Sequence, residues 1–376
     1  MKIYIGGYGT CGCHHEKQEL INLIGFYGND KDVYLTENVE DADLIVFIDT
    51  CVSTIKTIEC MLGVLNYILN KKKSNAEVLV SGCLAYNVKF KYPNNALDIL
   101  NKTTIVPSSK IIEYVLSRLN IMVSENHKLE TRVPYSFKDD IIMFSPCSGC
   151  PNHCSFCKSL YVDYTPKSIS LDDIKLFAQD ITTLSGNVLL EIASSNFTTY
   201  GIDLYGKQRA HEVISILSEP SNVQGISCGA LINFYPELID EILKNKKVKD
   251  IFTSLETGSE SLYNTMHRPI SLNDWISVVN QIRKKRPDIL IRSEIIAGYP
   301  GETADDVAKT INLIKELGIY VPFVWPYLDS PYLFSHTLPQ HGNEYIDASR
   351  KTYVKRLERH NEVVLNKYNR DGEYNI

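Results

Sequence analysis

Continuous apolar runs alternate with amphipathic stretches in the first third of the chain. Three runs, Lys2–Ile5, Leu44–Ile48 and Val78–Ser81, are short and almost wholly apolar, as in parallel strands buried on both faces. Between them, Lys17–Leu23 and Lys56–Leu69 carry apolar residues at helical spacing. This alternation predicts a small doubly wound, Rossmann-like α/β domain.

A second series of strand-like runs begins at Ile141, and helix-like segments separate its members. Six such units predict a partial (β/α)6 barrel rather than a closed eight-stranded one. A long charged helix is expected at about Tyr345–Tyr368. The predicted strands are Ile141–Phe144, Val188–Ile192, Gly225–Cys228, Ile251–Leu255, Leu290–Ile296 and Val321–Tyr327.

A polar stretch separates the two series. Residues 124–140 contain Pro134 and show no clear period, so we expect a linker there. The predicted domains are therefore residues 1–123 and residues 141–376.

Composition is ordinary for a soluble globular protein, with 44% hydrophobic and 22% charged residues. The sequence contains no run of 18 apolar residues that would predict a membrane span. Its first residues, MKIYIGGYG, lack the charged region and apolar core of a signal peptide. We therefore expect a cytoplasmic protein, and in that compartment a chain with ten cysteines favours metal ligation over disulfides. A net charge of −6 with scattered basic residues makes nucleic acid an unlikely partner.

Cys150, Cys154 and Cys157 have the spacing CxxxCxxC in the run CPNHCSFC. Three thiolates at this spacing can bind three irons of a [4Fe–4S] cluster and leave the fourth iron open to a ligand. Phe156 lies inside the last spacing, where an aromatic ring can shield the cluster and pack on a flat ligand. Zinc knuckles also group cysteines, so the spacing alone leaves both metals open.

A second set of cysteines follows the three predicted strands of the first domain. Cys11 and Cys13 come after the first strand, Cys51 after the second and Cys83 after the third. Loops at the carboxyl ends of parallel strands gather in one crevice, and neighbouring glycines let the backbone approach a bulky group. We predict a second cluster on Cys51, Cys83 and either Cys11 or Cys13; buried structural cysteines are the alternative.

Three further cysteines have other predicted places. Cys60 on a predicted helix and Cys228 in a predicted strand are expected in the core. Cys147 is either a bystander or a thiol near the active site.

With both cysteine sets in view, the chain resembles the radical S-adenosylmethionine (SAM) methylthiotransferases. The runs GTCGC, DTC and SGCLA are similar to the family's N-terminal cluster domain. The barrel then carries CSFC, SSNFTTYGIDLYG, FYPELIDEIL, LETGSESLYNTMHRP and IIAGYPGET in the family's order. The TTYGIDLYG and FYPE runs look most like the branch that modifies an aspartate of a ribosomal protein. The resemblance implies two [4Fe–4S] clusters, SAM, and an electron donor such as flavodoxin or ferredoxin.

The resemblance also implies where SAM binds. Ser195 and Asn196 end a predicted strand, where the superfamily holds the amino group of SAM. The GYPGE turn lets backbone groups approach the adenosine. For each polar residue the alternative is a loop-capping role. The expected contacts are Phe156, Ser195, Asn196, Glu256, Gly258, Ser259, Gly298, Pro300 and Gly301.

The chain departs from the family pattern in three places. An expected Arg-Gly pair and Ser-Arg pair read Asp163-Tyr164 and Ser168-Ile169, and an expected Gln-Asp pair reads Ser195-Asn196. The family's C-terminal TRAM-type barrel, which binds RNA or protein, is missing from the sequence. We therefore expect a small peptide substrate.

The activity implied by the resemblance is insertion of a methylthio group at an unactivated C–H bond. One SAM would methylate a sulfide carried by the first-domain cluster, and a radical from a second SAM would activate the substrate carbon. A ribosomally made peptide is the first substrate considered, with tRNA or a ribosomal protein as alternatives. A two-cluster enzyme that crosslinks peptides and a non-catalytic iron–sulfur scaffold are the other hypotheses.

Overall fold

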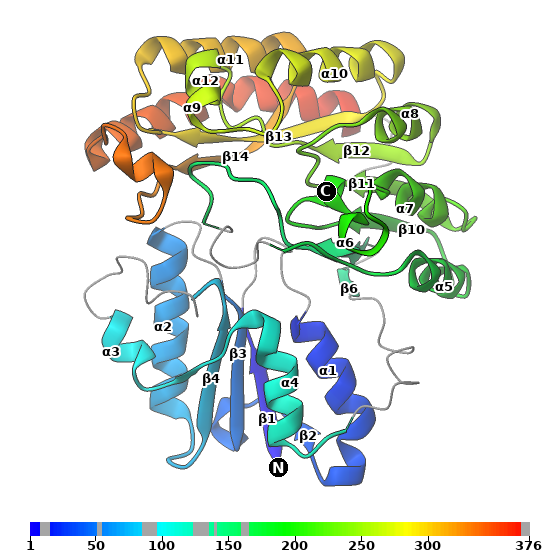
Figure 1. Cartoon of the computed structure of the whole chain (residues 1–376), viewed down its shortest axis with the longest axis vertical. Helices are drawn as coiled ribbons and strands as arrows, with labels where there is room; N and C mark the ends of the chain where they lie inside the picture. Colours follow the sequence, from blue (N-terminus) through cyan, green and yellow to red (C-terminus); the bar gives the residue numbers. More distant parts are fainter. Residues whose placement is uncertain are drawn as a thin grey trace. The chain divides into compact units, whose positions relative to one another are not determined.

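The computed structural model describes residues 1–7, 16–50, 55–84, 96–122, 135–138, 141–158 and 165–369. It contains two compact units, the first built mainly on Met1–Ser136 and the second mainly on the chain that follows (Figure 1). The predicted domain limits at residues 123 and 140 stay a prediction.

A five-stranded parallel sheet forms the centre of the first unit, in the order β2-β1-β3-β4-β5. This is the strand order of flavodoxin-like doubly wound sheets, which confirms the Rossmann-like prediction. The order reverses between β1 and β3, so the ligand crevice of such a sheet lies at their carboxyl ends. The strands are β1 (Lys2–Gly6), β2 (Tyr34–Leu35), β3 (Leu44–Thr50), β4 (Glu77–Gly82) and β5 (Thr104–Ile105).

Helices cover both faces of this sheet. Figure 1 shows α2 (Ile55–Lys71) and α3 (Ala96–Leu100) on one side, and α1 (Glu16–Tyr27) and α4 (Ser108–Arg118) on the other. An apolar cluster joins the sheet to α1 and α4. The removal of these side chains from water stabilises the packing of the helices on the sheet. Two 3₁₀ turns, Asn29–Lys31 and Val39–Asp41, complete the described part of this unit. The cluster includes Ile3, Leu20, Ile24, Val46, Leu79 and Val115.

A seven-stranded sheet in the order β14-β13-β12-β11-β10-β7-β6 curves through the second unit. From β7 to β14 every neighbouring pair is parallel and follows chain order, which confirms the partial (β/α)6 barrel. The strand β6 falls within the stretch predicted to be a linker and forms the edge strand of this sheet beside β7. The strands are β6 (Tyr135–Lys138), β7 (Ile141–Phe144), β10 (Val188–Ile192), β11 (Val223–Cys228), β12 (Val248–Phe252), β13 (Leu290–Ala297) and β14 (Tyr320–Pro326). A short hairpin pairs β8 (Cys147–Ser148) with β9 (Lys167–Ser168).

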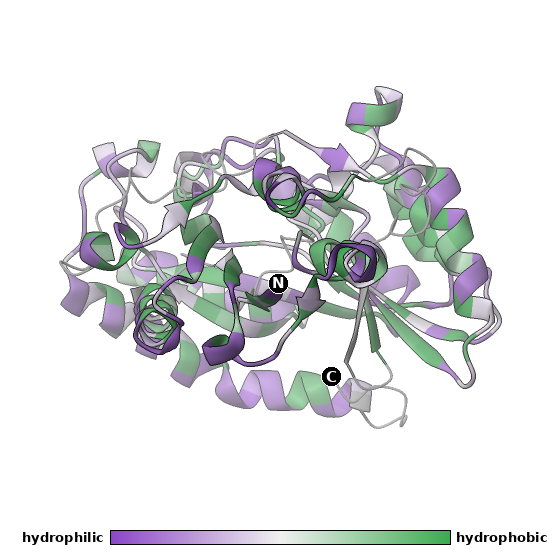
Figure 2. Ribbon diagram, turned by 90° about the horizontal axis from the view of Figure 1, so that it is seen from below, coloured by the Kyte–Doolittle hydropathy of each residue, from purple (hydrophilic) through white to green (hydrophobic). Residues whose placement is uncertain are grey.

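Six helices, α5, α7, α8, α10, α11 and α12, line the convex face of this sheet, each packed beside the next. Figure 2 shows hydrophilic and hydrophobic residues sharing the helices of the chain. Ser170 and Ser271 cap α5 and α10, and Thr303 with Asp306 forms a capping box on α11. The helices are α5 (Leu171–Thr182), α6 (Ile202–Tyr205), α7 (Ala210–Leu217), α8 (Pro236–Lys244), α9 (Glu260–Thr265), α10 (Leu272–Lys285), α11 (Ala304–Leu317) and α12 (Asn343–Asn369), with 3₁₀ turns at Phe197–Thr199 and Phe334–Thr337.

Side chains of β13 alternate between the helices and the concave face of the sheet. Ile291, Ser293 and Ile295 are fully buried under the helices. Arg292, Glu294 and Ile296 take the opposite direction, and Ile296 packs there with Phe156 of the cysteine loop. The concave face is therefore the face that carries the polar groups and meets the predicted cluster.

Two sequence predictions need correction in detail. The strand predicted at Ile251–Leu255 occurs as β12, Val248–Phe252, because Glu256 turns the chain with a φ of 67° and keeps only an isolated bridge to β13. Cys60 is exposed on α2, so its predicted core position is wrong, whereas Cys228 is buried in β11 as predicted. Within the described residues, no helix has the length and apolar character needed to cross a bilayer.

Candidate iron–sulfur and cofactor site

The three cysteines of the CxxxCxxC run lie in the segment that follows β7. Cys150 and Cys154 are buried and Cys157 is half-buried. Burial raises the pKa of Cys154 to about 12, Arg268 opposes this, and the nearby charges of Cys157 and Cys150 add to it. Three thiolates gathered in this way need a strong positive charge between them, which iron supplies.

Ser155 lies between Cys154 and Cys157, and each of its polar groups makes a hydrogen bond. Its N–H donates to the carbonyl of Met266 (3.0 Å), and its carbonyl accepts from the N–H and hydroxyl of Ser335 (3.2 and 2.9 Å). Its hydroxyl lies 2.8 Å from the Tyr299 hydroxyl, which also donates to the carbonyl of Thr265. Three distant segments of the chain thus fix the cysteine loop.

Phe156 packs into an apolar cluster beside the cysteines. Leu262, Ile296, Tyr299 and Tyr327 belong to this cluster, and the guanidinium of Arg268 lies 5.8 Å from the Phe156 ring centre. The ring therefore packs against an apolar wall and lies near a cation. Its predicted shielding role stays a prediction.

Arg268, which the sequence analysis did not single out, lies beside the cysteines. Its Nη1 donates to the sulfur of Cys154 (3.3 Å) and its Nη2 donates to the carbonyl of Ser254 (2.7 Å). The guanidinium lies 3.7 Å from the Glu256 carboxylate. Its Nε is buried and has no hydrogen-bond partner among the described residues. A buried donor without an acceptor beside the cysteines suits a ligand that brings a carboxylate, as the methionine part of SAM does.

Two carboxylates accompany Arg268 on the concave face. Burial raises the pKa of Glu256 to about 8, the charge of Glu294 adds to this, and Arg268 opposes it. Glu294, also missed from sequence, accepts hydrogen bonds from Ser254 (2.9 Å) and from the indole of Trp325 (2.8 Å). Carboxylates so placed can accept hydrogen bonds from the hydroxyl or amino groups of a bound ligand.

Other predicted cofactor residues lie apart from this group. The Gly258 N–H donates to Thr310 of α11 (2.9 Å), and the Ser259 hydroxyl donates to Asp306 of the same helix. These two hydrogen bonds attach the loop after β12 to α11. Asn196 is fully buried against Cys150, and Ser195 precedes it in the loop after β10. The predicted roles of these residues in binding SAM stay predictions.

The GYPGE turn follows β13 and is bound to α12. Gly298 has a φ of 74°, and a Cβ there would lie 2.6 Å from Ile346 of α12, so the position requires glycine. Glu302 is buried, and its carboxylate accepts hydrogen bonds from the Gly298 N–H and from Ser349. Pro300 and Gly301 complete the turn. The turn is thereby held in one conformation beside the site.

Replacing Glu302 with glutamine is expected to flatten the pH dependence of stability. Burial raises the Glu302 pKa from 4.5 to about 7, so the folded state keeps a proton that the unfolded state releases. Stability is then highest below pH 4.5 and falls as pH rises to 7, by about 3 kcal/mol. Urea unfolding can be followed by tryptophan fluorescence, since Trp275 and Trp325 both lie in the second unit.

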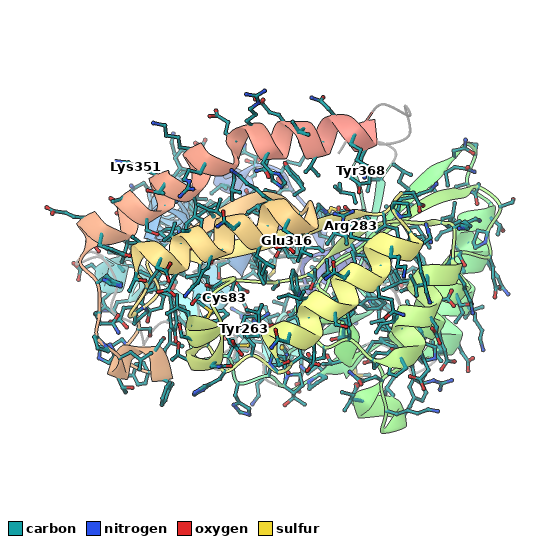
Figure 3. The ribbon with its side chains drawn as sticks, turned by 90° about the horizontal axis from the view of Figure 1, so that it is seen from above. Cys83, Tyr263, Arg283, Glu316, Lys351 and Tyr368 are labelled. Atoms are coloured by element: carbon teal, nitrogen blue, oxygen red, sulfur yellow. The ribbon has the colours of Figure 1, made fainter. Side chains whose placement is uncertain are left out.

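The matched control for Glu302→Gln is Glu316→Gln, an exposed carboxylate on α11 that Figure 3 labels. The control should keep the parent's pH dependence. An unchanged loss of stability from pH 5 to 8 in Glu302→Gln would contradict the assignment.

In the first unit, Thr50 fixes the chain on both sides of Cys83. Its hydroxyl donates to the carbonyl of Ser81 and accepts from the N–H of Leu84, both at 2.7 Å. Gly82 has a φ of 84°, and a Cβ there would lie 2.7 Å from the backbone nitrogen of Thr50. Cys83, labelled in Figure 3, is therefore held beside the last residue of β3.

The end of β1 also approaches β3 closely. A Cβ on Gly7 would lie 1.5 Å from the carbonyl oxygen of Ile48, so only glycine fits there. Cys11, Cys13 and Cys51 lie outside the described residues, as do Asp163 and Tyr164. The second cluster on Cys51, Cys83 and Cys11 or Cys13 therefore stays a prediction.

Two family models match this chain, one mainly over each unit. Residues 144–314 match the model of the Radical SAM superfamily, and residues 4–99 match that of Uncharacterized protein family UPF0004. The chain is 26% identical over 363 residues to "Ribosomal protein uS12 methylthiotransferase RimO" of Clostridioides difficile (strain 630), covering 91% of this chain and 79% of that one. It is 27% identical over 346 residues to the "tRNA-2-methylthio-N(6)-dimethylallyladenosine synthase" of Thermotoga petrophila, covering 86% and 75%.

Among solved structures, the cobalamin-dependent S-adenosylmethionine radical enzyme OxsB with aqua-cobalamin and S-adenosylmethionine bound is similar in fold. The TM-score is 0.55 at 10% identity, over 97% of this chain and 56% of OxsB. At that identity the likeness concerns the fold alone.

The cysteine loop at the carboxyl end of β7, on a partial barrel that matches the superfamily model, defines a radical SAM enzyme. Because its relatives match across both units, the chain belongs to the methylthiotransferase family of these enzymes. It is thus a transferase that inserts sulfur, and its cofactors are two [4Fe–4S] clusters and SAM, as predicted.

Proposed function

We propose that this methylthiotransferase modifies a peptide, within the maturation of a ribosomally made product. The observation that carries the proposal is the charge of the concave face. Register places Glu191, Ser227 and Asp250 in one row across the sheet, and Glu294 lies above them. Arg292 is neutralised by Asp250, with its Nη2 2.5 Å from the carboxylate.

Among the described residues of this face, Asp250 pairs with Arg292 and burial raises the pKa of Glu256 to about 8. Glu191 and Glu294 then stand against one cation, Arg268, and this balance does not favour the phosphates of a nucleic acid. Phosphate recognition needs Lys or Arg in numbers, whereas the chain has a net charge of −6. A peptide brings neutral or cationic groups, which these carboxylates can accept. The proposed electron donor is a flavodoxin or ferredoxin.

The site residues have distinct proposed roles in this reaction. The [4Fe–4S] cluster on Cys150, Cys154 and Cys157 supplies, with SAM, the radical chemistry that activates a C–H bond. Arg268 orients the carboxylate of SAM through its unpaired Nε. Glu256 and Glu294 accept hydrogen bonds from its polar groups, and Phe156 excludes water from the cysteines.

A tRNA or ribosomal-protein substrate is the second candidate, favoured by the names of the two relatives. To decide, the reconstituted protein is incubated anaerobically with reductant, methyl-labelled SAM and three fractions of the source cells: small peptides, total tRNA and ribosomes. We expect label in the peptides with the added mass of a methylthio group, and none with Cys154→Ala.

Methylthiolated nucleosides in the tRNA, or label in a ribosomal protein, would replace the peptide proposal. A peptide that loses hydrogens without gaining label would point to the crosslinking alternative.

A further inference from the structure

Asn196 directs its amide at a sulfur of the predicted cluster. It follows β10 and is fully buried. Its Nδ2 lies 3.5 Å from the sulfur of Cys150 and 3.3 Å from Oδ1 of Asn233. Both hydrogens of the amide are thus engaged, one of them with the cluster ligand.

A closed ring of hydrogen bonds fixes the orientation of this amide. The Thr198 hydroxyl donates to Oδ1 of Asn196, and the N–H of Asn233 donates to the Thr198 hydroxyl (3.1 Å). Asn152, between Cys150 and Cys154, donates to the same Asn233 oxygen (2.9 Å). A flipped Asn196 would set oxygen against both Oδ1 of Asn233 and the Cys150 sulfur. The NH₂ group therefore faces the sulfur.

We propose that Asn196 raises the reduction potential of the cluster bound by Cys150, Cys154 and Cys157. Reduction adds one electron, from a low-potential donor, to the cluster and its thiolates. A hydrogen bond to a ligand sulfur favours the more negative, reduced state, and such bonds help to set cluster potentials. Arg268 acts in the same direction on Cys154, but its other contacts make it a poor probe. Asn196 thus acts on electron transfer through the cluster ligand Cys150. This role does not depend on which substrate the enzyme modifies.

The test is a redox titration of the full-length protein with both clusters loaded, with dithionite as reductant and electron paramagnetic resonance as readout. The Cys150/Cys154/Cys157→Ala variant assigns the signals. In Asn196→Ala, the ratio of reduced to oxidised barrel cluster at a fixed potential should fall about tenfold, which is about 59 mV for a one-electron couple. The first-unit cluster should not change and is the internal control. Unchanged potentials, or an equal shift in both clusters, would overturn the proposal.

A second pair of variants tests the hydrogen-bond ring without changing Asn196, the residue that donates to the sulfur. Thr198→Val removes the hydroxyl that orients the amide and should shift the same potential in the same direction. Thr198→Ser keeps the hydroxyl and should behave like the parent. A parental potential in Thr198→Val would count against the proposal. Loss of iron from both Asn196→Ala and Thr198→Val would assign Asn196 a structural role instead.

Discussion

A protein in which Cys150, Cys154 and Cys157 are all alanine is expected to keep about half of its iron after anaerobic reconstitution. Two four-iron clusters give roughly eight irons and eight sulfides per chain, and this variant removes the ligands of one cluster. It should also form no 5′-deoxyadenosine on reduction with SAM. Iron and sulfide analysis, with product chromatography, gives both numbers.

The matched control is Cys60→Ala, because Cys60 is an exposed thiol on α2. It should keep all the iron. Complete loss of iron from the triple variant, or a parent that binds only one cluster's worth, would show that the two cysteine sets do not hold separate clusters.

Arg268→Lys is expected to weaken SAM binding by about 10- to 100-fold at unchanged iron content. Lysine keeps the charge but cannot bond the Cys154 sulfur, the Ser254 carbonyl and a ligand carboxylate at once. A hydrogen bond to a charged group contributes about 1.5–3 kcal/mol, which gives that range. Equilibrium dialysis on the reconstituted protein measures the affinity.

Arg283→Lys is the control for this loss of a guanidinium fork. Arg283 on α10 donates to the carbonyl of Leu317 and to the hydroxyl of Tyr368 on α12, and Figure 3 labels both ends of the latter bond. Its replacement should lower stability without changing the affinity for SAM. Equal effects of the two variants on binding would remove Arg268 from the cofactor site.

The strands of the barrel could be predicted because their burial leaves a simple pattern. β7 and β10 begin and end where the sequence predicts, since each is a short, mainly apolar run in which alternate side chains are buried. β2 and β5 were missed because each has only two residues at a sheet edge. Too few side chains are buried there to produce a period.

The cysteine ligands could also be predicted, because their spacing is local in sequence. Arg268 could not be, since it meets Cys154 across 114 residues of chain. Its local signal was its place in the run LETGSESLYNTMHRP, three residues after the end of α9. Asn196 was predicted as a site residue from the sequence, but the direction of its amide depends on Asn233, which only the folded chain brings near.

The hydrogen bonds of Ser155 have a consequence for synthesis on the ribosome. The barrel strands lie side by side in the order in which they are translated, so each βα unit can dock as it emerges. The cysteine loop, however, is made long before its supports: Tyr299 follows Ser155 by 144 residues and Ser335 by 180. The hydrogen bonds that fix Ser155 are therefore complete only after Ser335, which follows the last strand, has left the exit tunnel. Iron delivered earlier would meet a loop without its full support. Cluster insertion in the cell should accordingly be a post-translational event.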